Sequence, residues 1–154
     1  MAAIRTSRFR TSALASTPTS QPRPAWDEQN AERHRQKHRK CFERLLGVAG
    51  REVTITEFKD RSQGAIDGSW AEFEADKLEN GKAVYFVDDQ LVQAVITLDR
   101  RVFRTCFHQH FDRPRDCEAL INGTPGDRRA LLLRHLMYGE KGRVYTGVKR
   151  IRGV

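Results

Sequence analysis

Four potential metal ligands lie close together in this sequence of 154 residues: Cys106, His108, His110 and Cys117. Thiolates and imidazoles are ligands that zinc prefers, but structural zinc sites usually combine paired C-x2-C or H-x3–5-H elements. The C-x-H-x-H-x6-C spacing is not one of those pairs, and it indicates a buried cysteine with solvent-facing histidines. We therefore expect no metal and no cofactor. A small metal or thiol enzyme is an alternative that only this cluster supports.

Two further sequence patterns could bind a cation or a phosphate. The acidic cluster Glu72, Glu74, Asp76 and Glu79 lacks the glycine and the ligand spacing of a calcium loop, and it is typical of a solvated rim. The glycines of residues 139–147 do not have the spacing of a phosphate-binding loop. We expect a non-catalytic protein with no catalytic residues.

The formal net charge of +8 is unevenly distributed. Residues 1–50 carry 10 basic and 4 acidic side chains, residues 51–100 carry 6 and 11, and residues 101–154 carry 12 and 5. Basic ends attract phosphates or acidic proteins, whereas an acidic middle repels nucleic acid. The basic run at residues 33–40 favours a solvated helix face over an RNA contact. Possible contacts with RNA or an acidic partner are Arg128, Arg129, Lys149, Arg150 and Arg152.

The first 26 residues form a basic segment with four arginines, no acidic residue and many Ser, Thr, Ala and Pro residues. This composition is typical of an organelle transit peptide and also of a disordered tail, and both interpretations stay open. Three cysteines without a signal peptide favour a reducing compartment. No stretch approaches the roughly 18 apolar residues of a membrane-spanning helix, so we expect no membrane association.

The periodicities predict two helices and five strands. Residues 27–48 form the first helix, because acidic residues lie near its start, basic residues near its end, and Gly47 follows. Alternating β-branched residues and an Asn80-Gly81 turn indicate strands at residues 53–56, 66–75, 83–87, 91–98 and 102–107, with a turn at 60–64. Thr124-Pro125 begins the second helix, which ends near residue 139, and residues 143–151 are a possible last strand.

A helix followed by five short strands, the second of them long and bent, is the order of elements in an Sm-like barrel. Residues 50–76, GREVTITEFKDRSQGAIDGSWAEFEAD, resemble a first Sm motif, with Gly68 followed by Trp70 and Phe73. Residues 33–58 and 92–103 are similar to the seventh-gemin type of Sm-like subunit in the survival-of-motor-neuron complex. The resemblance covers roughly residues 30–108.

The resemblance implies a mainly β fold with flanking helices (α+β). It would be a small, open Sm-like barrel with an N-terminal helix and an extra C-terminal helix. The domain organisation that follows has three parts. Residues 1–26 are the tail or transit peptide, residues 27–111 the Sm-like domain with its leading helix, and residues 112–154 a basic extension.

Departures from the Sm pattern imply that the barrel pairs with another protein and does not bind RNA. RNA-binding members carry an Asn after the second strand, where this chain has KLE at residues 77–79. They carry Ile-Arg-Gly between the last two strands, where this chain has TLD at residues 97–99. The strand edges of an open barrel are templates for a partner's strand. The expected edge contacts are Leu91, Val92, Ala94, Val95, Ile96, Val102 and Phe103. Phe42, Leu45 and Leu46 would pack over the barrel's open end or bind an eighth-gemin-type chain.

The function that the resemblance implies is that of a scaffold subunit in assembly of small nuclear ribonucleoproteins for mRNA splicing. It would pair edge to edge with another Sm-like subunit of the sixth-gemin type, in the nucleus and cytoplasm. The alternative is a mitochondrially imported basic protein of a large ribonucleoprotein such as the mitoribosome. This alternative explains the segment 1–26 and the basic C-terminus better.

Overall fold

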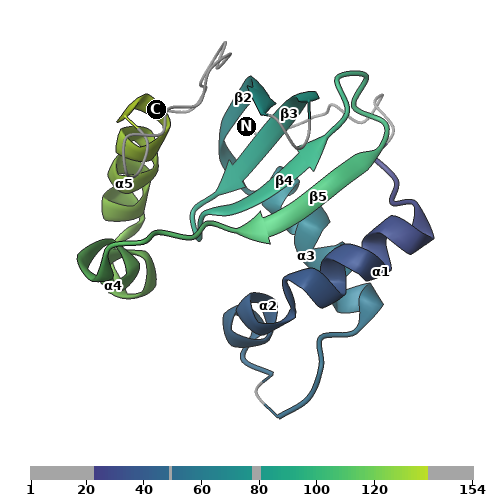
Figure 1. Cartoon of the computed structure of the whole chain (residues 1–154), viewed down its shortest axis with the longest axis horizontal. Coiled ribbons are helices and arrows are strands. Elements are labelled where there is room, and N and C mark those ends of the chain that lie inside the picture. Colours follow the sequence, from purple (N-terminus) through teal and green to yellow (C-terminus); the bar gives the residue numbers. More distant parts are fainter. Residues whose placement is uncertain (1–22, 49, 78–80, 139–154) are drawn as a thin grey trace, which may run out of the picture.

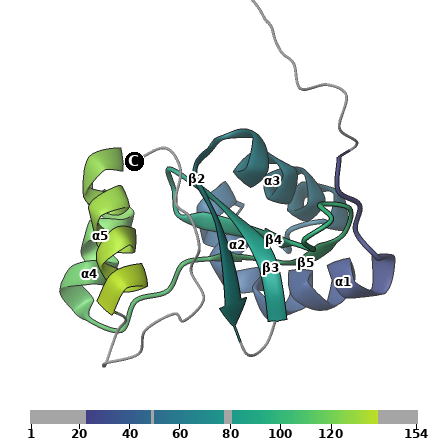
Figure 2. The ribbon, with the colours of Figure 1, turned by 90° about the horizontal axis from the view of Figure 1, so that it is seen from above.

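The computed structural model describes residues 23–48, 50–77 and 81–138 (Figure 1). Its architecture is α+β, with helices on both sides of one four-stranded antiparallel sheet (Figures 1 and 2). More of these residues lie in helices than in strands, so the expectation of a mainly β fold is corrected. The sheet is open, and the Sm-like barrel is not confirmed.

The first expected helix is present as two helices, α1 (Glu28–Lys37) and α2 (Arg39–Leu46). Asp27 caps α1, because its carboxylate accepts a hydrogen bond from the backbone N–H of Asn30 at 3.0 Å. The chain leaves helical geometry at His38, and Gly47 ends α2 with a φ of 67°. Because the helix is broken here, α1 packs against strand β5 (Phe103–His108), and the ring of Phe42 on α2 lies in the core.

The expected strand at residues 53–56 and the turn at 60–64 are wrong, because helix α3 (Ile55–Asp67) includes the second half of that strand and the whole turn, and residues 53 and 54 are not in a strand. Thr54 and Glu57 form a capping box, in which the threonine hydroxyl accepts from the Glu57 N–H and the glutamate accepts from the Thr54 N–H. The apolar side of α3 follows a helical period, with Phe58 and Ala65 fully buried. The alternation of Val53 and Ile55 covers too few residues to outweigh these signals.

The other four expected strands are confirmed, with shifted boundaries. They are β2 (Ser69–Lys77), β3 (Gly81–Asp88), β4 (Val92–Ile96) and β5 (Phe103–His108). Each strand pairs with the next along the chain, so their spatial order is the same as their sequence order. One row of the sheet consists of Phe73, Tyr85, Val95 and Thr105.

Two helices of the C-terminal part cover the face of the sheet opposite to α1, α2 and α3. Helix α5 (Pro125–Tyr138) confirms the second expected helix and buries Leu132 completely beneath the sheet. Helix α4 (Pro114–Asn122) was not predicted, although Pro114 and Asp116 are favourable residues for a first helical turn. Residues 114–138 thus contribute to the core. The expected strand at residues 143–151 lies outside the described residues.

We predict that Thr54→Ala lowers the free energy of unfolding by about 1 kcal/mol, because the cap of α3 is lost. Chemical denaturation of the full chain measures this change. Thr56→Ala is the matched control, since Thr56 is exposed two residues further along the same helix. Equal effects of the two substitutions would contradict a capping role for Thr54.

Candidate functional site

The strand predicted to be an exposed edge lies in the middle of the sheet. β4 pairs with β3 on one side and with β5 on the other, so its backbone cannot receive a partner's strand. The expectation of an exposed edge at this strand is therefore wrong. Its apolar side chains on both faces are explained by burial in the two cores. The residues concerned are Leu91, Val92, Ala94, Val95 and Ile96.

The outer side of β5 is an edge, but the N-terminal part of the chain covers it. The Phe103 N–H donates to the carbonyl of Ala25 at 2.9 Å, and the Asn30 side-chain amide donates to the Arg104 carbonyl at 3.0 Å. Trp26 stacks on the ring of Phe103 with 4.8 Å between ring centroids. Residues 23–26, expected to belong to a tail, are thus part of the fold. Phe103 is buried, whereas Val102 is exposed beside the bridge to Ala25.

The outer edge of β2 is different, because no strand pairs with it among the described residues. Ala71, Phe73 and Ala75 belong to the core beneath α5, so the alternate acidic side chains lie on the other face. Glu72 forms an ion pair of 2.6 Å with Arg100. Further along the strand, Glu74 is half-buried and Asp76 is exposed. Asp76 lies directly opposite Lys82 of β3, so Glu74 is the acidic side chain of this strand that faces neither Arg100 nor Lys82.

The turn between β3 and β4 gathers polar contacts from several elements. One carboxylate oxygen of Asp88 accepts from the backbone N–H groups of Gln90 and Val92 at 2.9 and 3.0 Å. The other forms an ion pair of 2.6 Å with Arg61 of α3, and both side chains are largely buried. The indole N–H of Trp70 donates to the Asp88 carbonyl at 3.0 Å. This turn therefore connects β2, α3 and β4.

Helix α5 reaches the same turn through two of the arginines predicted to contact RNA or an acidic partner. Arg128 donates from Nε to the Asp89 carbonyl at 2.6 Å, and Arg129 forms an ion pair of 2.7 Å with the Asp89 carboxylate. Arg129 also lies 5.3 Å from the ring centroid of Trp70. Both arginines are half-buried and anchor α5. Lys149, Arg150 and Arg152 lie outside the described residues.

A cavity of about 210 Å³ lies beside this turn, between α2, β5, α4 and α5. Its polar lining consists of Arg44, Gln90, His108 and Arg128, and its apolar lining of Leu45, Leu120 and Ile121. Sequence reasoning missed the cavity because its residues come from five separate segments. Arg44 and Leu45 are adjacent on α2. The sequence predicts a packing role for Leu45 and no role for Arg44.

His108 is a half-buried member of this lining. Its Nε2 lies 2.9 Å from the Gln90 carbonyl, which can only accept, so Nε2 carries a proton and donates it to this hydrogen bond. Burial lowers the pKa of His108 below its ordinary value, and the nearby Arg44 and Arg61 lower it further. The Gln90 carbonyl and Asp88 act in the opposite direction.

The cysteine and histidine cluster does not come together. Cys106 is buried in the core beneath α3, whereas Cys117 packs against the core beneath α5 and donates to the Phe111 carbonyl at 2.9 Å. His110 is exposed beside Asp112. Burial raises the pKa of the Cys106 thiol to about 12, which keeps it protonated and unreactive. Within residues 23–48, 50–77 and 81–138, no group of three or more His, Cys, Asp or Glu residues could hold a metal ion.

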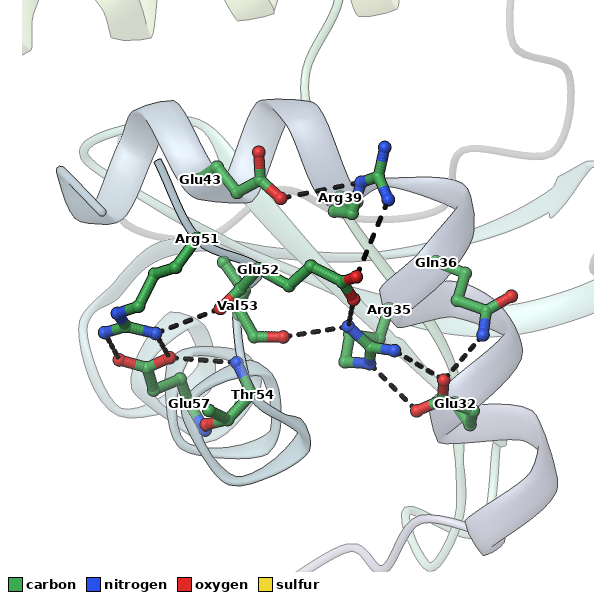
Figure 3. Close-up of polar contacts among 10 residues, drawn as sticks. All are labelled: Glu32, Arg35, Gln36, Arg39, Glu43, Arg51, Glu52, Val53, Thr54 and Glu57. Carbon is green, nitrogen blue, oxygen red and sulfur yellow. Dashed lines mark hydrogen bonds and ion pairs between the residues drawn. The ribbon is translucent and has the colours of Figure 1, made fainter. Parts of the chain in front are cut away.

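The basic run at residues 33–40 is partly structural (Figure 3). Arg35 donates to both carboxylate oxygens of Glu32 at 2.8 and 2.5 Å, and also to Glu52 at 3.0 Å and the Val53 carbonyl at 2.9 Å. Arg51 and Glu57 form a second pair in the same region. These contacts join α1 to the segment that leads into α3, so part of the run's positive charge is already neutralised.

The other predicted packing residues lie in the core beneath α3. Phe42 contacts Phe58 edge to face at 5.0 Å between ring centroids. Leu45 and Leu46 are half-buried against the same core.

The chain has no match among the known proteins compared with it. No family model, no curated protein and no solved structure matches it. In the part of the chain that the structure describes, no helix is long and apolar enough to cross a membrane.

We predict that Asp88→Asn lowers the free energy of unfolding by about 3 kcal/mol, because Arg61 keeps its buried charge and loses its counter-charge. Asp67→Asn removes the partner of an exposed ion pair with Arg23 and should cost less than about 1 kcal/mol. Denaturant unfolding of both variants measures the difference. A cost for Asp88→Asn no larger than that of the control would reject the central role of this pair.

The contacts of Glu32 predict a pH dependence. Hydrogen bonds from Arg35 and then Gln36 lower the pKa of Glu32 from 4.5 to about 2. Because the folded-state pKa is depressed, the stability that this carboxylate contributes is present above pH 4.5 and is lost as the pH falls towards 2. We expect the side-chain carboxyl of Glu32 to titrate in NMR spectra with a midpoint near pH 2.

Arg35→Met should return that midpoint towards the ordinary value. Arg39→Met is the control, since Arg39 pairs with Glu43 and Glu52 and not with Glu32. An unchanged midpoint in Arg35→Met would show that the Arg35 contact is not the cause.

Proposed function

We propose that this chain is a non-catalytic, protein-binding subunit that receives a partner's strand at the outer edge of β2. The observation that carries the proposal is the difference between the two edges of the sheet. The β5 edge is covered by residues 23–26 and α1, whereas β2 has no strand neighbour on its outer side among the described residues. Unpaired backbone N–H and C=O groups at such an edge favour strand addition.

The side chains of β2 favour a partner other than a second copy of the chain. An antiparallel pair of two β2 strands centred on Phe73 would set Glu72 opposite Glu74, and like charges directly opposite one another are destabilising. A strand with a basic residue on one face would instead pair favourably with Glu74, whose neighbour on β3 is the apolar Val84. Its other face would need apolar residues, because it would extend the core beneath α5.

The predictions of a particular ribonucleoprotein complex are separate from this proposal. Assembly of small nuclear ribonucleoproteins with sixth-gemin-type and eighth-gemin-type partners stays a prediction that rests on sequence resemblance. Helix α3 counts against it, because it occupies the place of the first expected strand. The mitoribosomal alternative also stays a prediction, and it rests on the basic segments at the two ends, outside the described residues for the most part.

The test compares two charge reversals in the full chain, each used to recover partners from a lysate of source cells. Glu74→Lys should reduce recovery of the specific partner about tenfold, because an attractive cross-strand pair becomes repulsive. Glu118→Lys is the matched control, since Glu118 is an exposed acidic residue on α4.

A photo-crosslinking residue at position 74 locates the contact. The expected adduct contains a partner segment with alternating basic and apolar residues. Crosslinks that form only from position 118, or equal recovery with both reversals, would overturn the proposal.

A further inference from the structure

The cavity beside the β3–β4 turn contains two arginines whose charges are not neutralised by an ion pair. Arg44 and Arg128 both line it, and neither forms an ion pair with a carboxylate in the part of the chain that the structure describes. The neighbouring Arg61 and Arg129 differ, because Asp88 and Asp89 pair with them at 2.6 and 2.7 Å. Two like charges on one small cavity raise its positive potential and favour an anion between them.

Arg128 is held in place for such a contact. Its Nε donates to the Asp89 carbonyl and its Nη1 to the Gly123 carbonyl, at 2.6 and 2.5 Å. Both partners are neutral carbonyl groups, so the full positive charge remains, and Nη2 is left as a further donor. A fixed guanidinium loses little conformational entropy when it binds an oxyanion. Arg44, on the facing helix α2, is exposed and can complete the contact.

The remaining lining limits the ligand. Leu45, Leu120 and Ile121 form an apolar wall, and Ile121 is 63% exposed. The volume of about 210 Å³ is smaller than the roughly 300–1,000 Å³ of typical small-molecule sites. A nucleotide or a large cofactor is therefore too big, whereas one charged group with a short apolar substituent fits both walls.

We infer that this cavity binds a small oxyanion, a phosphate ester or a carboxylate, whose charged group lies between Arg44 and Arg128 and whose apolar part contacts Leu120 and Ile121. This site is separate from the β2 edge and does not depend on the proposed pairing function. Phosphate esters and carboxylates share the chemistry that guanidinium groups recognise, and the choice between them is left to the experiment.

His108 supplies an independent signal of occupancy. The groups that act on it are Arg44 from α2, Arg61 from α3, and Asp88 and the Gln90 carbonyl from the β3–β4 turn. A bound anion offsets the effect of the arginines, so the pKa of His108 should rise when the cavity is filled. Binding should accordingly strengthen as the pH falls.

The experiment is an NMR titration of the full chain with phenyl phosphate and with benzoate, and with phenol as the neutral analogue. We expect saturable shifts of the Leu120 and Ile121 methyl signals with at least one of the two anions, and none with phenol. Arg44→Gln should weaken binding at least about tenfold, because a charge-assisted hydrogen bond is lost. Arg104→Gln, which removes an exposed arginine on β5 away from the cavity, should bind as the unmodified chain does.

A second measurement follows the ring protons of His108 with pH. At the concentration of the better-binding anion that saturates the unmodified chain, adding the anion should move the midpoint upward in the unmodified chain and in Arg104→Gln, and move it less in Arg44→Gln. The inference is overturned if no saturable shift appears up to about 10 mM ligand. Equal binding of phenol, or equal weakening by the two arginine substitutions, would also overturn it.

Discussion

The Asp88 carboxylate, at the turn between β3 and β4, is the contact on which the rest of the structure depends. One oxygen holds the turn by accepting from Gln90 and Val92, and the other pairs with Arg61 of α3. The turn needs this support because Leu91 has a φ of 60°, a left-handed conformation that costs an L-residue about 1–2 kcal/mol. Burial of the Leu91 side chain offsets that cost. Because Asp89 next to it anchors α5, the two helical layers are fixed to the same short segment.

This arrangement brings together basic side chains that lie far apart in the sequence. Arg44, Arg61, Arg128 and Arg129 gather at one end of the sheet, around the turn and the cavity. The acidic residues of β2 lie along an edge of the same sheet. Arginines therefore line the cavity, whereas β2 carries acidic side chains on one face. The formal net charge of +8 does not indicate either of these two features.

The patterns along the chain predicted β2, β3, β4, β5 and α5, because each of these elements carries a local period or a turn signal. They failed at α3, where the alternation of Val53 and Ile55 indicated a strand, although Thr54 and Glu57 form the capping box of a helix. They also missed α4. The expected role of β4 was wrong for another reason. Apolar residues on both faces are typical of a central strand, and β4 is one. The same residues predicted an edge strand that pairs with a partner.

The sequence by itself determined the local elements and the composition of their faces, since periodicity, caps and turn residues act over a few positions. It also determined that the middle of the chain is acidic and its ends basic. Only the tertiary structure decided that the β5 edge of the sheet is covered, because Trp26 and Asn30 contact β5 from a distant part of the chain. It likewise decided that Arg44 and Arg128 share one cavity. Contacts between remote segments depend on how the layers pack, and no pattern within a single segment encodes them.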